Sequence, residues 1–595
     1  MVFANIRDIS GKQCHFVIIA RLTEDPSITV AVLEAGPAHL EDPAILTPTG
    51  FTGQLGNKEY DWMYQTVPQN HLDNLQYIIN SGRGLGGSSS MNFLAWTRPP
   101  REDIDALVAL GNPGWDWESF IEYCKKSERF VPGAPDVLAM HGQKYEQGTL
   151  GTQGPVTVSF PKLVSRGDIA LRSSLKSKGI PVLDNALSGQ VTGTWCSVAT
   201  IDPETQTRSN SVTAYLLPHI DRPNLVVLTG AVANSIITTD SSGTVVGSGI
   251  AFTHDGAKHE VYAERDIILC AGAIQSPKIH ELSGIGDRRI LERIGVDVRL
   301  DLPGVGNNLQ EHITYVGISF ELKEDSGVET WDPLRDPAFA ALERELYDQH
   351  KEGLFTMVPS GLTFLPLQIL SENAAAIVER HAKTLQEKAH LYTPGTLLQH
   401  ELQLENLRNP QLPECELIAF PGFRGNLNEV QPGRRYFSIV PTLCHPFSRG
   451  SVHIASSDPE KLPQIDPCYL QQDIDMDIMV EAFRFARSLA NEEPLREIIA
   501  KEACPGEEIS SEEAIREHVK RSCKSTWHTC GSLSMLPREC GGVVDPQLKV
   551  WGTKNIRIAD LSIVPLQVAS HTQALVYSIA ERAADILKSE IGSLL

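Results

Sequence analysis

Glu34 is the first residue whose type and position suggest a specific chemistry. It ends a β-branched and apolar run at residues 28–33 and precedes an Ala-Gly dipeptide. An acidic side chain at the end of the second strand of a βαβ nucleotide-binding unit accepts hydrogen bonds from both hydroxyls of a ribose. Such a unit also carries a G-x-G-x-x-G turn about 20 residues upstream of the acid. Counting back from Glu34 reaches residues 10–15 (SGKQCH), which contain a single glycine.

A glycine-rich stretch at residues 81–96 (SGRGLGGSSSMNFLAW) has the G-x-G-x-x-G spacing at residues 82–87. The expected partner is missing, because about 20 residues further on lies the charged helical segment 101–105 rather than a strand that ends in an acid. Two interpretations stay open. The stretch is either a nest of backbone amides that approaches a phosphate, with the hydroxyls of Ser88 and Ser89 as further donors, or a flexible turn.

Histidine is the side chain whose ordinary pKa lies closest to neutral pH, which suits it to accept and return a proton during catalysis. The chain has 18 histidines, and His528 and His571 lie in its C-terminal part. A histidine taken alone is more often solvated or satisfied by hydrogen bonds in the core. Cys523, Cys530 and Cys540 lie near His528, but their spacings of seven and ten residues match no metal-ligand pattern. We therefore expect buried structural thiols and no metal site.

Composition excludes several classes of function. The 595-residue chain has a net charge of −22, which argues against nucleic acid and anionic membranes as partners because both require a basic surface. No apolar run approaches the ~18 residues of a membrane helix, and the run at residues 16–20 is too short for a signal peptide. The eleven cysteines form no C-x-x-C pair, and the sequence has no N-x-S/T sequon. These features predict a protein of a reducing, cytoplasmic compartment.

The order of the expected elements predicts an α/β domain interrupted by a mixed domain of sheet and helices. Residues 224–237 are typical of a strand pair, and residues 261–271 of a strand that leads into a glycine turn. The middle of the chain, about residues 320–410, changes to amphipathic helices of mixed charge. Strand-rich sequence returns at residues 437–470, and residues 573–590 are expected to form a final helix.

Several long segments, in the same order along the chain, resemble the glucose–methanol–choline (GMC) family of FAD-dependent oxidoreductases. The segments are 82–99 (GRGLGGSSSMNFLAWTRP), 272–286 (GAIQSPKIHELSGIG), 301–312 (DLPGVGNNLQEH), 445–459 (HPFSRGSVHIASSDP) and 541–565 (GGVVDPQLKVWGTKNIRIADLSIVP). His280 stands where the family usually has an aliphatic residue. Because the segments are independent and span nearly the whole chain, the resemblance is specific.

The resemblance implies an α/β plus α+β architecture. A Rossmann-like FAD-binding domain is interrupted by a substrate domain that has an antiparallel sheet and helices. Residues 1–320 are expected to form mainly the FAD-binding domain, and residues 321–520 mainly the substrate-binding domain. Residues 521–595 are expected to return to the FAD domain and to carry the active-site histidines.

The implied cofactor is FAD, and the resemblance places its contacts residue by residue. The matched residues are Ala233 for the adenine, Glu34 for the ribose, Ser88, Ser89 and Asn92 for the loop beside the pyrophosphate and the flavin ring, Ala559 and Asp560 for the ribityl–pyrophosphate region, and Thr572 and Gln573 for the flavin pyrimidine.

The resemblance also assigns His528 and His571 as the active-site pair. Hydride transfer from an alcohol carbon to a flavin requires loss of the hydroxyl proton, so we expect His528 to act as the base and His571 to fix the substrate oxygen. The expected reaction oxidises a small-molecule alcohol to a carbonyl, with oxygen or a quinone-like compound as electron acceptor. Two histidines favour the aryl- or primary-alcohol branch, and the lack of a signal peptide and sequons favours a tailoring step in secondary metabolism.

The glycine-poor start leaves alternatives open. Aligning the segment IARL with the family ending AARL, without a gap, places Ser10, Lys12 and His15 on the three fingerprint glycines. The fingerprint is then expected to be degenerate at residues 10–15, with side chains in the space that the pyrophosphate and the helix need. The alternatives are a mis-called N-terminus, weakened FAD binding, or a non-catalytic homologue without flavin. A lyase of the same fold is a further one.

Overall fold

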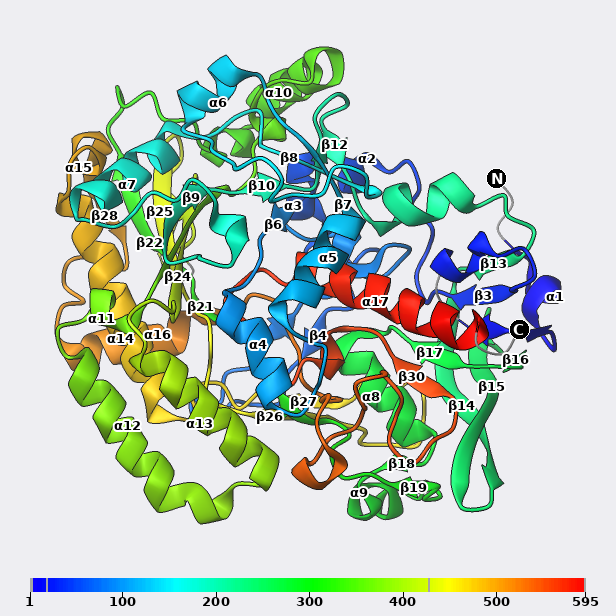
Figure 1. Cartoon of the computed structure of the whole chain (residues 1–595). Coiled ribbons are helices and arrows are strands. Elements are labelled where there is room, and N and C mark those ends of the chain that lie inside the picture. Colours follow the sequence, from blue (N-terminus) through cyan, green and yellow to red (C-terminus); the bar gives the residue numbers. More distant parts are fainter. Residues whose placement is uncertain (1–3, 18–19, 426–427, 593–595) are drawn as a thin grey trace.

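The computed structural model describes residues 4–17, 20–425 and 428–592. The first domain is built around a parallel sheet (Figure 1). The strand order is β13–β3–β2–β17–β30, and every neighbouring pair is parallel. The strands are β13 (Leu225–Leu228), β3 (Val30–Leu33), β2 (Phe16–Val17), β17 (Ile267–Leu269) and β30 (Ile556–Ile558). Every residue of β17 and β30 is buried, as expected for a parallel sheet covered on both faces.

The C-terminal helix and a second sheet pack against these strands. Helix α17 (Gln573–Gly592) places one face in the same core as the strands, and the residues of that face, each about one turn from the next, are Leu575, Ile579, Ala583, Leu587 and Ile591. The second sheet has the order β1–β16–β15–β14. Its strands are β1 (Gln13–Cys14), β14 (Ala231–Ser241), β15 (Thr244–His254) and β16 (Ala257–Ala263).

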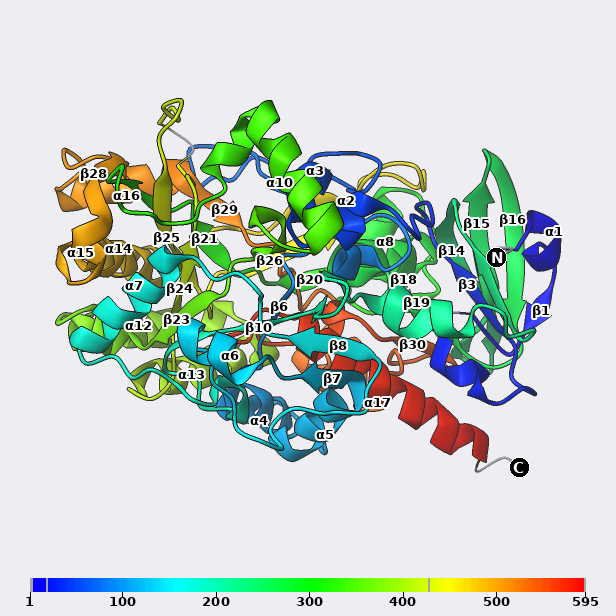
Figure 2. The same cartoon turned by 90° about the horizontal axis from the view of Figure 1, so that it is seen from above.

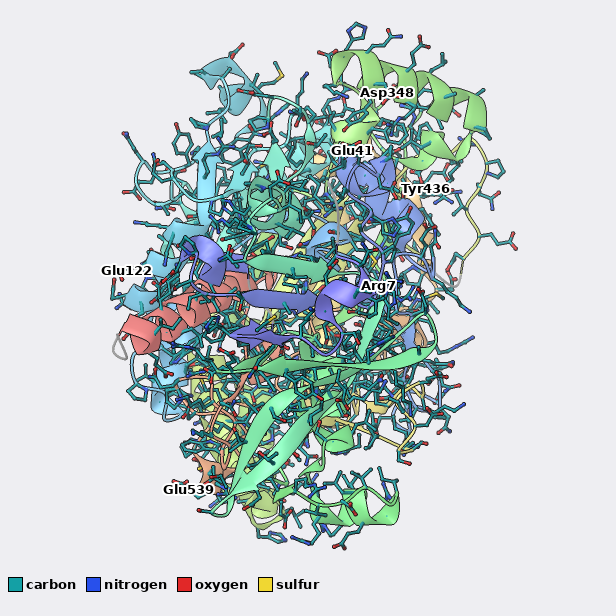
Figure 3. All side chains as sticks on the ribbon, turned by 90° about the vertical axis from the view of Figure 1, so that its right-hand side faces the viewer. Arg7, Glu41, Glu122, Asp348, Tyr436 and Glu539 are labelled. Carbon is teal, nitrogen blue, oxygen red and sulfur yellow. The ribbon has the colours of Figure 1, made fainter. Side chains whose placement is uncertain are left out.

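Strand β2 is the middle strand of the parallel sheet, and the chain that leads to it corrects one expectation. Helix α1 (Ile6–Ile9) ends at Ser10, and Lys12 and His15 also precede β2. Figure 3 shows Arg7 of α1 at the surface on this side of the molecule. The glycine fingerprint of a nucleotide-binding unit follows its first strand, so residues that precede β2 cannot take its place. The ungapped alignment of the sequence analysis is therefore wrong.

The connection from β2 to β3 is short and has no glycine. Phe16 lies opposite Val30 in the parallel pair, so residues 18–29 are all that separates the described end of β2 from the start of β3. Residues 18 and 19 lie outside the described residues, and the described remainder contains the 3-10 helix Ala20–Glu24. A βαβ unit usually has a glycine turn and a full helix at this place. The chain thus lacks the turn, instead of carrying a substituted form of it.

The second domain is built on an antiparallel sheet of order β28–β22–β25–β24–β23–β9, to which β21 and β29 are paired. The strands are β9 (Gly193–Cys196), β21 (Ile313–Tyr315), β22 (Ile318–Leu322), β23 (Gly361–Leu365), β24 (Cys415–Phe420), β25 (Tyr436–Leu443), β28 (Ile499–Cys504) and β29 (Cys523–Ser525). Helix α14 (Asp473–Ser488) packs on β25. Figure 2 shows this sheet at the end of the molecule opposite to β14–β16.

The expected fold class is confirmed, with a parallel-sheet domain joined to an antiparallel-sheet domain. The expected helices of the middle region are α10 (Pro337–His350), α12 (Ala374–Lys388) and α13 (Pro394–Arg408). Cys523 and Cys530 are buried as expected, whereas Cys540 is partly exposed. In the part of the chain that the structure describes, no helix is both long and apolar enough to cross a membrane.

Candidate active site

His528 is placed by a bulge between two antiparallel strands. Strands β21 and β29 pair Ile313 with Ser525, and a bridge further along pairs Gln310 with Cys530. Between these pairs, two residues of one strand face four residues of the other. The longer segment carries His528 out of the ladder, as β-bulges next to active sites do.

Glu311 supports the bulge from the opposite strand. Its Oε1 accepts a hydrogen bond from the backbone N of His528 at 2.7 Å, and its Oε2 accepts one from the hydroxyl of Ser525 at 2.8 Å. Burial raises the pKa of Glu311 to about 8, in spite of these hydrogen bonds. Trp527 has a φ of 65°, which is unfavourable for a bulky side chain. Backbone strain of this kind is typical of functional sites.

His312 contacts the ring of His528 directly. The two Nδ1 atoms are 2.9 Å apart, and Nε2 of His312 lies 2.9 Å from the carbonyl oxygen of Val568. Burial, followed by the charges of His445 and His571, lowers the pKa of His312 to about 3. His312 is therefore neutral at physiological pH.

His571 comes from the loop before α17. Its backbone N donates to Oγ1 of Thr97 at 2.9 Å, and its Nε2 lies 2.8 Å from Oε1 of Glu416 on β24. Glu416 is only 3% exposed, so this ion pair is shielded from water. The ring centroids of His528 and His571 are 5.2 Å apart. Strands of both domains and the loop before α17 thus bring the two predicted histidines together.

The two histidines have opposite pKa shifts. Burial, followed by the neighbouring imidazoles of His312 and His571, lowers the pKa of His528 well below its ordinary value. Burial also acts to lower the pKa of His571, but the charge of Glu416 and its hydrogen bond outweigh burial and raise that pKa. The pair therefore favours one neutral and one protonated imidazole side by side, which suits one ring to accept a proton and the other to donate a hydrogen bond.

Glu34 lies at the carboxyl end of β3, beside two glycine segments. Its Oε1 accepts hydrogen bonds from the backbone N of Gly36 at 2.8 Å and of Gly84 at 3.1 Å. A Cβ on Gly36 would lie 2.3 Å from the N of Gly84, so this close approach requires glycine. The N of Ala231 donates to the carbonyl of Glu34 at 2.8 Å, which brings the start of β14, with Ala233, to the same edge.

The loop residues Ser88, Ser89 and Asn92 are held by hydrogen bonds within the protein. The hydroxyl of Ser88 accepts from the N of Gly82 at 3.1 Å, and the hydroxyl of Ser89 donates to the carbonyl of Gly86 at 2.7 Å. Oδ1 of Asn92 accepts from the guanidinium of Arg208 at 2.7 Å. These hydrogen bonds describe an ordered turn, in which the hydroxyl of Ser89 is used as a donor and that of Ser88 only as an acceptor.

Ala559 and Asp560 lie at the carboxyl end of β30. Oδ2 of Asp560 accepts hydrogen bonds from the N of Gly272 at 2.9 Å and from the hydroxyl of Ser276 at 2.6 Å, so it holds the start of α8 (Gly272–Leu282). The N of Ala559 donates to the carbonyl of Leu269 in β17. Asp560 therefore ties the ends of two neighbouring parallel strands to the start of a helix.

Two observations at these strand ends fit the flavin that the resemblance implies. Cys270 is exposed although β17 before it is buried, and burial of its surroundings raises the pKa of its thiol, so its side chain lies deep but faces open space. Oε1 of Gln573 is buried and has no hydrogen-bond partner among the described residues, and Thr572 beside it is 7% exposed. An unpaired acceptor there suits an N–H donor such as that of the flavin pyrimidine. The flavin end of the site fits FAD, whereas the phosphate end lacks the turn after β2.

The sequence analysis did not assign Glu311, His312, Glu416 or Thr97. Glu311 and His312 end the family-like segment 301–312, and an acid–histidine pair directly before a strand is a signal that could have found them. Glu416 has no such local signal, because it meets His571 only through the fold, 155 residues away in sequence.

Comparison with known proteins agrees with this architecture. The GMC oxidoreductase family matches at residues 21–314 and 446–580, and the first match begins within the connection between β2 and β3. A relative called dehydrogenase mpl7, from Monascus purpureus, is 33% identical over 98% of this chain and 96% of its own length.

Two solved structures have the same overall fold. An FAD-dependent oxidoreductase from Chaetomium thermophilum has a TM-score of 0.88 and 29% identity, and the match covers 97% of this chain and 99% of that one. A structure described as a new fungal aryl-alcohol oxidase has a TM-score of 0.86 and 27% identity, with the same coverage of 97% and 99%. The chain therefore belongs to the GMC oxidoreductase family of FAD-dependent oxidoreductases.

Proposed function

We propose that this protein oxidises a small-molecule alcohol to a carbonyl, with His528 as the base. The main support is the opposed pKa shifts of two rings whose centroids are 5.2 Å apart. Neutral His528 accepts the proton of the substrate hydroxyl, and protonated His571 donates a hydrogen bond to the substrate oxygen. Bound FAD supplies the acceptor for the hydride of the alcohol carbon.

In this proposal the carboxyl ends of the parallel strands hold FAD. The residues that would hold it are Ala233 and Glu34 at the nucleotide end, Ser88, Ser89 and Asn92 in the glycine loop, Ala559 and Asp560 beside α8, and Thr572 and Gln573 at the start of α17. Because the hydroxyl of Ser89 already donates to Gly86 while that of Ser88 only accepts, we expect the contact to come from the backbone of the glycine loop and the hydroxyl of Ser88. The start of α17 adds backbone amides that favour a negatively charged group nearby.

Aromatic side chains beside His528 support an aryl or other apolar primary alcohol as the substrate. The ring of Trp527 meets Phe93 at a centroid distance of 5.8 Å, and Phe93 meets Phe51 at 4.1 Å. Phe51 in turn meets Trp331 at 6.2 Å. Phe51 is only 2% exposed and backs the row from the core, so Trp527 and Phe93 are the rings that would offer apolar area and edge-to-face contacts to an aromatic substrate. The solved relative described as an aryl-alcohol oxidase is consistent with this choice.

The reaction also needs an electron acceptor and has a biological setting. Either oxygen or a quinone-like compound would take the electrons from the reduced flavin. We also propose that this oxidation is a tailoring step in secondary metabolism and that it takes place in the cytoplasm. The name dehydrogenase of the Monascus relative supports the same reaction class.

As a second candidate, this chain is a member of the family that binds FAD weakly or not at all. The observation that favours it is the connection after β2, where residues 18–29 contain no glycine. The backbone amides of the missing turn would otherwise contact the pyrophosphate, so their loss weakens the hold on the nucleotide half of FAD.

Replacing His528 tests the proposed reaction. In the presence of excess FAD, His528→Ala is expected to lower kcat for a panel of aryl and aliphatic alcohols by at least ~10²-fold, as for loss of a general base, while flavin content stays unchanged. His381→Ala is the matched control, because His381 is also buried but lies on α12 against Phe447. Near-normal turnover of His528→Ala would remove His528 from the mechanism.

A further inference from the structure

We infer that His312 is a positioning residue that sets the tautomer of His528. This inference rests on the proposed role of His528 as the base. A neutral histidine has one protonated and one unprotonated ring nitrogen, and only the unprotonated one accepts a proton. The base is therefore competent only if the nitrogen that faces the substrate is the unprotonated one.

The carbonyl of Val568 decides where the proton of His312 lies. A carbonyl only accepts hydrogen bonds, so Nε2 of His312, at 2.9 Å from it, must carry the proton. Because His312 is neutral, its Nδ1 is then an unprotonated acceptor.

The position of the proton on His312 in turn decides the position of the proton on His528. Their Nδ1 atoms are 2.9 Å apart, and two unprotonated nitrogens would repel each other at that distance. Nδ1 of His528 must therefore carry the proton and donate it to His312. This leaves Nε2 of His528 unprotonated and free to accept the hydroxyl proton of the substrate.

Thr526 supports the same assignment from another side. Its hydroxyl donates to the carbonyl of His312 at 3.2 Å, so its oxygen presents a lone pair to Nδ1 of His528, also at 3.2 Å. Both neighbours of that nitrogen are thus acceptors. The backbone of His528 is held as well, by Glu311 at its N and by the side chain of Gln567 at its carbonyl.

Charged side chains around His312 keep its ring neutral. His445 lies between Asp103 at 3.1 Å and Glu414 at 3.3 Å, and these carboxylates raise its pKa to about 10, against the effect of burial. Protonated His445 and His571 both disfavour a second positive charge on His312. When His528 takes up the substrate proton, neutral His312 accepts a charge-assisted hydrogen bond from the resulting imidazolium.

The tautomer is measured by ¹⁵N NMR of histidine-labelled protein, with the His528 signals assigned by their loss in His528→Gln. We expect the wild type to have a protonated Nδ1 and an unprotonated Nε2 on His528. His312→Leu removes the nearer of the two acceptors, leaves Thr526 at 3.2 Å, and should move the proton to Nε2 in part of the molecules. His312→Asn restores an acceptor beside Nδ1 and should keep the wild-type tautomer.

Kinetics with excess FAD give the second readout. His312→Leu is expected to lower kcat by about tenfold or more with little change in KM, on the scale of residues that orient a reacting histidine. His312→Asn should recover most of the loss, and His381→Leu controls for removal of a buried histidine elsewhere.

The inference is overturned if wild-type His528 is protonated at Nε2, or if His312→Leu leaves both the tautomer and kcat unchanged. If no variant oxidises any alcohol, the proposed function fails, but the NMR signals still decide the tautomer. The wild-type and His312→Asn spectra decide it even if His312→Leu does not fold.

Discussion

The two ends of the cofactor site are built to different degrees. At the histidine end, Glu311, His312 and Glu416 hold the two reacting rings through hydrogen bonds of 2.7 to 2.9 Å. At the phosphate end, the crossover of residues 18–29 has no glycine and follows the central strand β2 directly. The hydrogen-bonded histidine pair is thus complete, whereas no glycine stands between β2 and β3 to form a phosphate-binding turn. Because the two features lie in separate segments of the chain, each can be changed without the other.

The largest effect is expected from repairing the phosphate end. A G-x-G-x-x-G turn followed by a helical turn, inserted between β2 and the 3-10 helix Ala20–Glu24, should lower the Kd for FAD on the order of 10²-fold or more. Two or three amide hydrogen bonds to a charged phosphate, at about 1.5–3 kcal/mol each, supply that change. The Kd is measured by the quenching of FAD fluorescence.

An insert of equal length with alanine in place of each glycine is the control for this repair. Alanine keeps the added length but blocks the close approach of backbone and phosphate. Equal gains from both inserts would assign the effect to length alone. No gain from either insert would mean that the missing turn does not limit FAD binding.

A smaller effect is expected from Glu416→Gln at the histidine end. The charge and hydrogen bond of Glu416 outweigh burial and raise the pKa of His571, so the protonated ring is stabilised and its proton is lost as the pH rises through that pKa. Removing the charge of Glu416 lowers that pKa, so the alkaline limb of the kcat/KM profile should move to lower pH, with about a tenfold loss at neutral pH. In the wild type no acidic limb from His528 is expected near pH 6, because the pKa of His528 lies well below its ordinary value.

Glu414→Gln is the matched control for Glu416→Gln. Glu414 lies two residues earlier in the chain and contacts His445 instead of His571. In Glu414→Gln, the alkaline limb of the kcat/KM profile should stay at the wild-type pH. If the alkaline limb does not move in Glu416→Gln, that limb does not report the titration of His571.

Much of the fold was predictable because its signals are local. The helical spacing of residues 573–590 and the two apolar runs at 224–237 each depend on neighbours in sequence. They form α17 and the strands β13 and β14, although these two strands belong to different sheets and do not pair with each other. The site residue Glu416 was not predictable, because strand pairing alone brings it to His571.

The error at the start of the chain has a physical cause as well. Strand β2 starts the apolar run at residues 16–20, but polar residues precede this run and no glycine turn follows it, so the sequence alone does not mark it as the central strand. Its identity comes from its partners, since Phe16 lies opposite Val30 and Val17 lies beside Ile267. A shortened crossover is therefore recognisable only once both neighbouring strands are in place.

The most direct test is the visible absorbance of the purified chain during titration with FAD, followed by anaerobic addition of an aryl alcohol. We expect little flavin on the chain as purified, saturable uptake of added FAD, and bleaching of the bound flavin by the alcohol. A chain that stays colourless at high FAD would contradict the proposal that the carboxyl ends of the parallel strands hold FAD without the turn after β2. Flavin that binds but is not bleached by any alcohol would contradict the proposed chemistry of the histidine pair.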